Sequence, residues 1–177
     1  MNEMKSMGET ALPEHDQRGL DQKLVAAAIG GDATGVAMLL SAGASAEMID
    51  DMGRNAFENA VRGQCLEAME LLAGKSDVNR RSINGWTPLA ESILMRRSEA
   101  VVAFLASVSD LSLKNRPPGK DFMDLEDFSL ECGSPEAADV VAHERGRRAA
   151  GAERAQIASE VACPAGNLEA QKKRPRI

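Results

Sequence analysis

The six residues Asn84-Gly85-Trp86-Thr87-Pro88-Leu89 decide the fold of this chain. A threonine before a proline predicts the start of a helix, because the hydroxyl can cap free N–H groups and proline suits the first helical turn. The glycine two residues earlier favours a turn. A first helix is predicted to follow, and then a second one over residues 98–106. The stretch therefore predicts a turn that leads into a pair of helices.

The same arrangement returns at a nearly constant interval along the chain. Gly53, Gly85 and Gly119 lie 32 and 34 residues apart, and a further helical stretch precedes them from Leu24 to Ala44. An interval of about 20–50 residues is typical of proteins built from stacked repeats. One helix pair cannot bury its apolar face alone, so the units are expected to stack on one another.

Three stretches are similar to the consensus of the ankyrin repeat family. Gly85 to Leu89 resembles G-x-T-P-L-H-x-A, Leu24 to Gly31 resembles L-x-x-A-A-x-x-G, and Ser76 to Asn79 resembles the A-D-V-N that closes a unit. The resemblance implies an all-α fold with short β-turn fingers. This fold is an ankyrin-repeat solenoid of about four helix–turn–helix repeats.

Two copies depart from the family pattern. The second is one residue short near Arg62-Gly63-Gln64 and lacks the family's G-H turn there. In the fourth, Gly119 comes one residue late, and Asp121, Phe122 and Met123 replace T-P-L. The fourth copy is therefore either a true repeat or a capping repeat with a remodelled first helix.

The repeat pattern predicts the helices and the domain organisation. Four helix pairs are expected, over residues 22–30 with 34–41, 55–62 with 66–73, 87–95 with 98–106, and 122–131 with 135–145. Four leucines are predicted to be buried between repeats: Leu39, Leu72, Leu89 and Leu105. We expect a disordered or capping N-terminal arm over residues 1–18, the ankyrin repeat domain over 19–145, a C-terminal helix over 146–163, and a disordered basic tail over 164–177.

The composition favours packed helices and excludes several classes of protein. Hydrophobic residues make up 44 % of the 177 residues but aromatic residues only 3 %, so we expect a core of Ala, Leu, Val and Met. The net charge of −6 gives no general attraction for nucleic acid or anionic lipid. Three cysteines, Cys65, Cys132 and Cys163, with no CxxC pair among them are typical of neither a disulfide framework nor a zinc site. No apolar run could span a membrane and residues 1–18 hold no signal-peptide core, so we expect a soluble, cytoplasmic protein. On its own it is expected to be a monomer.

No pattern of residues predicts catalysis, a cofactor or a metal site. His15 and His143 have no nucleophile partner at a recognisable spacing. The acidic stretch from Asp121 to Glu131 lacks the spacing of a calcium loop, and we interpret it as a solvated helix face. No phosphate-binding glycine loop is present. We therefore predict that the chain is not an enzyme.

The resemblance to ankyrin repeats implies a protein partner on the concave face, which the fingers and the first helices form. Trp86 stands between the turn glycine Gly85 and the helix start at Thr87, and it either contacts the partner or packs on the neighbouring finger as structure. The same correspondence places ten residues on the predicted partner-binding face: Asp51, Met52, Arg54, Arg62, Ile83, Asn84, Trp86, Leu94, Met95 and Lys120.

The basic C-terminal tail supports an alternative function. Its cations, which resemble a short nuclear import signal, are Lys172, Lys173, Arg174 and Arg176. With Arg145, Arg147 and Arg148 the tail could engage nucleic acid or the import machinery. In this alternative the chain is a bacterial effector or a regulatory protein that acts inside a host cell, in the nucleus or after secretion. The leading hypothesis remains an adaptor or inhibitor that binds one protein partner.

Overall fold

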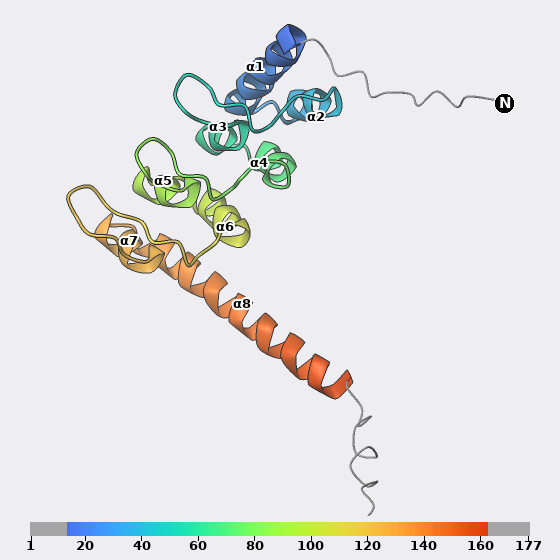
Figure 1. The fold of residues 1–177 in the computed structure, drawn as a ribbon. Coiled ribbons are helices and arrows are strands. Elements are labelled where there is room, and N and C mark those ends of the chain that lie inside the picture. Colours follow the sequence, from blue (N-terminus) through green and yellow to red (C-terminus); the bar gives the residue numbers. More distant parts are fainter. Residues whose placement is uncertain (1–13, 163–177) are drawn as a thin grey trace, which may run out of the picture.

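A stack of antiparallel helix pairs makes up the protein (Figure 1). The computed structural model describes residues 14–162, with side chains over residues 16–158. Neighbouring pairs contact one another along the stack, and the loops that connect successive pairs project on one side as fingers (Figure 1). The described residues form eight helices and no sheet: α1 (Glu14–Gly30), α2 (Ala33–Ser41), α3 (Ala56–Gly63), α4 (Leu66–Ala73), α5 (Pro88–Leu94), α6 (Glu99–Val108), α7 (Leu125–Glu131) and α8 (Pro135–Ala162). The predicted all-α repeat solenoid is confirmed.

The first helix of each inner repeat begins at a capping side chain. Asn55 accepts a hydrogen bond from the N–H of Glu58, whose carboxylate accepts one from the N–H of Asn55, so the two form a capping box. Thr87 caps α5 and is followed by Pro88 at its first position, as the sequence predicts. These caps hold the finger and the helix start in a fixed relation, because each one satisfies N–H groups that a helix leaves free.

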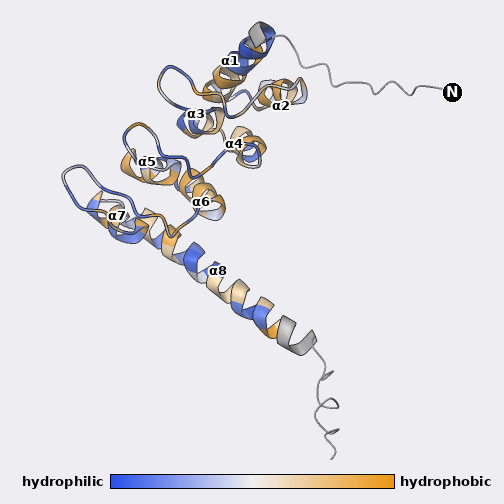
Figure 2. Cartoon of the chain, viewed as in Figure 1, coloured by the Kyte–Doolittle hydropathy of each residue, from blue (hydrophilic) through white to orange (hydrophobic). Residues whose placement is uncertain are grey.

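The core runs through the whole stack. Large side chains from successive repeats are almost fully inaccessible to solvent, among them Phe57, Leu72, Leu89, Leu105 and Phe128. Hydrophobic residues are concentrated in the stacked helices, whereas the connecting loops and the far half of α8 carry many hydrophilic ones (Figure 2). Burial of this apolar surface is the main stabilising contribution in a repeat array.

Leu39 differs from the other three leucines that we predicted to be buried between repeats. It is only half-buried, although it packs against the core, and Val36 is the fully buried residue of α2. The physical reason is its place in the first helix pair, where only one neighbouring repeat is available to cover it.

Helix α1 begins at Glu14, eight residues before the predicted start. Residues 14–18, which we assigned to the N-terminal arm, are therefore helical, and residues 1–13 lie outside the described part of the chain. The amide of Gln17 donates to the carbonyl of Gly43 and to the carboxylate of Asp21, which in turn accepts a hydrogen bond from the N–H of Ser45. These bonds hold the first turns of α1 against the end of α2, a tertiary contact that the repeat pattern does not encode.

Helix α8 is continuous over 28 residues, so the helix predicted over residues 135–145 and the one predicted over 146–163 form a single helix. Gly146 and Gly151 lie inside it and do not interrupt it. Alanines around these two glycines favour the helix. Arg148 ties it to the previous repeat through hydrogen bonds to main-chain carbonyls at the end of α6. The far half of α8 extends beyond the stack (Figure 1), where the side chains from residue 149 to 158 are all exposed.

Helix α7 begins at Leu125, three residues after the predicted start. Asp124 is its cap and accepts a hydrogen bond from the N–H of Asp127. Phe122 and Met123 therefore belong to the third finger and not to the helix, because Met123 pairs with Asn115 in an isolated antiparallel bridge. The third finger is longer than the other two for this reason.

Candidate functional site

Three fingers form one row along the stack, and we call residues 50–54, 82–86 and 115–123 the finger row. The first two are tight turns. In the first, the N–H of Gly53 donates to the carbonyl of Asp50 over 2.9 Å, and in the second the N–H of Gly85 donates to that of Ser82 over 2.8 Å. Both glycines have positive φ angles, which glycine adopts at little cost. In the third finger the N–H groups of the paired residues Asn115 and Met123 each donate to the other's carbonyl over 2.8 Å.

Asp50 organises the first finger from its base. One carboxylate oxygen accepts hydrogen bonds from the N–H groups of Met52 and Arg54, and the other accepts one from the amide of Asn59 in α3. Partial burial raises the pKa of Asp50, but these hydrogen bonds together outweigh it and hold the pKa below its ordinary value. The ionised carboxylate thus stabilises the turn.

Arg80 joins the first two fingers. Its guanidinium donates to the carbonyl of Gly53 and to the carboxylate of Glu58, each over 2.8 Å. Burial raises the pKa of Glu58, and the hydrogen bond from Asn55 and the charge of Arg80 offset only part of that effect. The carboxylate that caps α3 is therefore also a tether for the next finger.

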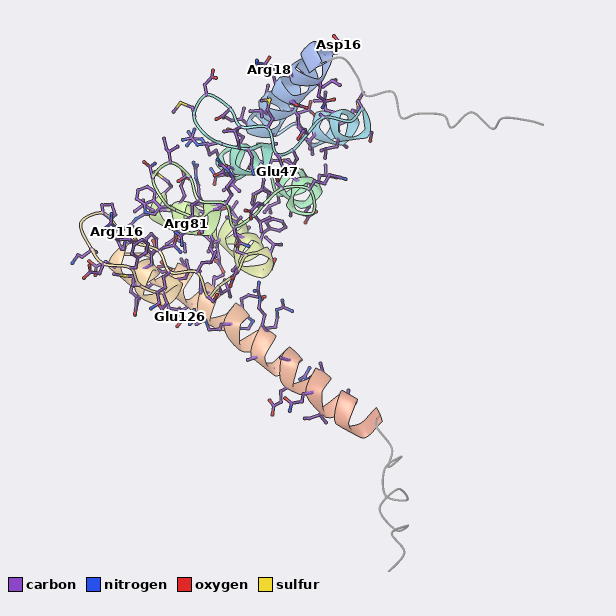
Figure 3. All side chains as sticks on the ribbon, in the orientation of Figure 1. Asp16, Arg18, Glu47, Arg81, Arg116 and Glu126 are labelled. Carbon is purple, nitrogen blue, oxygen red and sulfur yellow. The ribbon has the colours of Figure 1, made fainter. Side chains whose placement is uncertain are left out.

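Two side chains join the second finger to the third. The guanidinium of Arg81 donates to the carbonyl of Gly85 in its own finger and to that of Lys114 at the base of the next, each over 2.7 Å. The indole N–H of Trp86 donates to the carbonyl of Arg116 over 2.9 Å. Arg81 and Arg116 mark these neighbouring fingers in Figure 3. The row is therefore held together by side-chain to main-chain bonds as well as by the helices beneath it.

Of the ten predicted partner-binding residues, the finger row holds seven. Asp51, Met52, Ile83 and Asn84 are exposed at its turns, and Arg54 is half-buried at the base of the first finger. Lys120 is exposed on the third finger and pairs with Glu131 of α7 at 3.0 Å. Trp86 is the seventh, and it is half-buried.

The other three predicted residues lie at the ends of first helices, where the family pattern also places them. Arg62, Leu94 and Met95 follow at the far ends of α3 and α5, one helix length of roughly 10 Å from the fingers. Arg62 is exposed and lies 3.8 Å from the carboxylate of Glu91. Leu94 packs against the core, whereas Met95 is exposed. The structure thus separates these residues from the finger row.

Sequence reasoning missed Phe122, whose side chain is 60 % exposed on the third finger. The consensus alignment assigned it to a helix start, and the length of the third finger moves it outward. Phe122 and Trp86 line a slot of about 290 Å³ between the second and third fingers. The guanidinium of Arg116 lies over the ring of Phe122, 5.5 Å from its centre. The other residues that line the slot are Asn84, Gly85, Pro117, Pro118 and Gly119.

Arg145, Arg147 and Arg148, which the alternative hypothesis assigns to nucleic acid or the import machinery, form hydrogen bonds and ion pairs within the protein. Arg148 donates to the carbonyls of Ala106, Ser107 and Ser109, and so caps the end of α6. Arg147 and Arg148 both pair with Glu144, and Arg145 pairs with Glu126 at 2.7 Å. The cations of the tail, Lys172, Lys173, Arg174 and Arg176, lie outside the described residues.

The described part of the chain holds neither a metal-binding cluster nor a membrane-spanning helix. Within residues 14–162, no group of three or more His, Cys, Asp or Glu residues could hold a metal ion. No helix in this part of the chain has the length and apolar character needed to cross a membrane.

Comparison with known proteins gives one family. The sequence model of the family described as ankyrin repeats (3 copies) matches residues 24–115, which is more than half of the chain. The match spans the first three helix pairs and ends at the base of the third finger, so α7 and α8 lie beyond it. No curated protein matches the chain in sequence. The chain belongs to the ankyrin repeat family.

Proposed function

We propose that this protein binds one protein partner through the finger row, as an adaptor or an inhibitor, without catalysis. Ankyrin repeats are generally protein–protein interaction modules. The observation that carries the proposal is one exposed, large apolar side chain on each finger. Met52 is 57 % exposed, Ile83 76 % and Phe122 60 %. Large apolar groups aligned on one surface are typical of an interaction site.

The bonds between fingers support the proposal energetically. Ordering loops and side chains on binding costs free energy, and a surface that is already ordered avoids much of that cost. Arg80, Arg81 and Trp86 fix the fingers to one another before any partner arrives. The apolar side chains at the turns are thus presented on a rigid support.

The alternative, recognition of nucleic acid by the basic helix, has less support. Arg145, Arg147 and Arg148 are paired with carboxylates or main-chain carbonyls of the same chain. Recruiting them for phosphate contacts would break the cap of α6 or the ion pairs of α8. The net charge of −6 adds a general repulsion of polyanions.

Affinity capture with matched surface variants tests the proposal. The double variant Met52→Asp/Ile83→Asp changes two exposed residues of the finger row. The control, Met38→Asp/Leu71→Asp, makes the same charge change at exposed residues of α2 and α4. We expect one protein from the native lysate to bind the wild type and the control but not the finger variant, with all three folded by circular dichroism. Capture that survives in the finger variant and fails in the control would contradict the proposal.

A further inference from the structure

The slot between the second and third fingers has apolar walls. The indole of Trp86 and the ring of Phe122 line it, together with Pro117 and Pro118 of the third finger. Trp86 is fixed by its bond to the carbonyl of Arg116, and the two prolines have restricted backbones. A volume of about 290 Å³ is enough for a large side chain and too small for a folded element. The slot therefore fits one bulky apolar side chain of an extended segment.

The rim of the slot is cationic, although the chain as a whole is acidic. Residues 80–86 and 113–123 contain five cations and a single carboxylate, Asp121, in a protein of net charge −6. Four of these cations are exposed: Arg81, Lys114, Arg116 and Lys120. Lys120 pairs with Glu131, while the ammonium of Lys114 has no partner among the residues whose side chains are described. The local field around the slot therefore favours negative charge.

The first finger has the opposite character. It carries Asp50, Asp51 and Arg54, which gives it a net charge of −1, and Asp51 is exposed. The two ends of the finger row thus differ in charge, and the cationic end coincides with the apolar slot. Complementary charge selects partners and fixes their orientation, more than it adds raw affinity.

We propose that the slot takes a large apolar side chain from an extended, acidic segment of the protein partner, with the carboxylates lying over the second and third fingers. This inference rests on the proposed function and names the chemistry of the partner. A peptide is favoured over a nucleic acid because the excess of positive charge is limited to the second and third fingers. A long polyanion would also have to approach the acidic remainder of the chain.

Phage display tests the inference. Short random peptides are selected for binding to the full chain. We expect the selected peptides to be enriched in Asp and Glu around one aromatic or large aliphatic residue. Their binding should weaken as salt is raised, because the rim charges are exposed and screened. In the variant Lys114→Glu/Arg116→Glu we expect at least about a tenfold loss of affinity. The variant Phe122→Ser should weaken binding as well, since it removes one wall of the slot.

A charge-matched control separates the rim from the net charge. Lys23→Glu/Lys75→Glu changes the total charge equally at exposed residues outside the finger row, and it should leave the affinity unchanged. Neutral or basic selected peptides would overturn the inference. So would the absence of any selected peptide, or an oligothymidine that binds more tightly than the selected peptides.

The failure of this inference can be told apart from the failure of the proposed function. Suppose that the selected peptides ignore Lys114→Glu/Arg116→Glu and are lost in Met52→Asp/Ile83→Asp. The slot would then be excluded while the finger row remained the binding surface. Binding that ignores both double variants would overturn the inference and count against the finger row too.

Discussion

The indole N–H of Trp86 donates a hydrogen bond to the main-chain carbonyl of Arg116, across the gap between two fingers. The residue is half-buried and packs against the core, while part of its side chain lines the slot. This bond to the neighbouring finger supports the structural role that the sequence left open for Trp86. Contact with a partner stays a prediction, and the part of Trp86 that lines the slot is where such contact would occur.

Truncation of Trp86 should destabilise the protein as well as alter the slot. We expect Trp86→Ala to lower the free energy of unfolding by about 1–3 kcal/mol, less than for a fully buried tryptophan. Trp86→Phe keeps most of the packing and loses the hydrogen bond, and it should cost about 1 kcal/mol. Urea unfolding of the three proteins measures both differences. An unchanged midpoint in Trp86→Ala would remove the structural role.

Leu89 tests the stacking of the repeats. It is fully buried in the core, so Leu89→Ala should destabilise by about 2–5 kcal/mol through lost burial and a cavity. Leu130, 56 % exposed on α7, is the matched control, and its change to alanine should stay within about 0.5 kcal/mol. Thermal or urea unfolding gives both values. Equal effects of the two substitutions would show that the repeat register is wrong.

Sequence reasoning succeeded wherever the repeat pattern repeats itself. The second helix of the second repeat was predicted over residues 66–73, where α4 lies, because its apolar residues recur at helical spacing and Gly74 follows its last residue. It failed where a contact outside the pattern decides the structure. Gln17 and Asp21 hold the start of α1 against the loop after α2, and Arg148 ties α8 to the previous repeat. No local signal in the sequence reveals such bonds.

The candidate site was predictable in outline for the same reason. The turns of the first two fingers follow the consensus, so Met52 and Ile83 were placed correctly at the surface. Phe122 was missed because the third finger is longer than the consensus, and the pairing of Asn115 with Met123 that shapes it joins residues on opposite sides of a loop. The slot also depends on Trp86 reaching across to Arg116, which spacing alone cannot show.

In the second repeat, Gly63 and Gln64 form the turn at the end of α3 that the family's G-H pair forms in other repeats. Gln64 adopts a φ of 56° at the end of α3, a left-handed conformation that glycine would adopt more easily. Gly63 lies so close to α1 that an added Cβ would be 2.8 Å from the carbonyl oxygen of Ile29. We expect Gln64→Gly to stabilise by up to about 1 kcal/mol. Gly63→Ala should destabilise by about 1–3 kcal/mol. Chemical denaturation measures both changes in the free energy of unfolding. A destabilised Gln64→Gly and a stabilised Gly63→Ala would refute this explanation.

Glu144 should make stability depend on pH in the acid range. The hydrogen bond that Glu144 accepts from Arg147 lowers the pKa of this carboxyl group most. Burial raises the pKa, and the hydrogen bond from Arg148 lowers it further. Together they bring the pKa from 4.5 to about 2. A carboxyl group with a depressed folded-state pKa stabilises the fold fully above its unfolded pKa, and this contribution is lost as the pH falls through the folded value. The advantage of the wild type over Glu144→Gln should therefore shrink between pH 4.5 and about 2. Glu153 is exposed, and Glu153→Gln is the control. If the difference in the free energy of unfolding between the wild type and Glu144→Gln did not change with pH, this prediction would be contradicted.

Site-specific photo-crosslinking tests the central claim, binding of a protein through the finger row, most directly. Photoreactive benzoylphenylalanine replaces either Ile83, which is 76 % exposed on the second finger, or Met38, which is 68 % exposed on α2. The two positions are similarly accessible, so they differ mainly in the surface that they report. We predict that irradiation in the native lysate links one protein to position 83 and not to position 38. A partner that crosslinks to position 38 while position 83 gives no product would contradict the account.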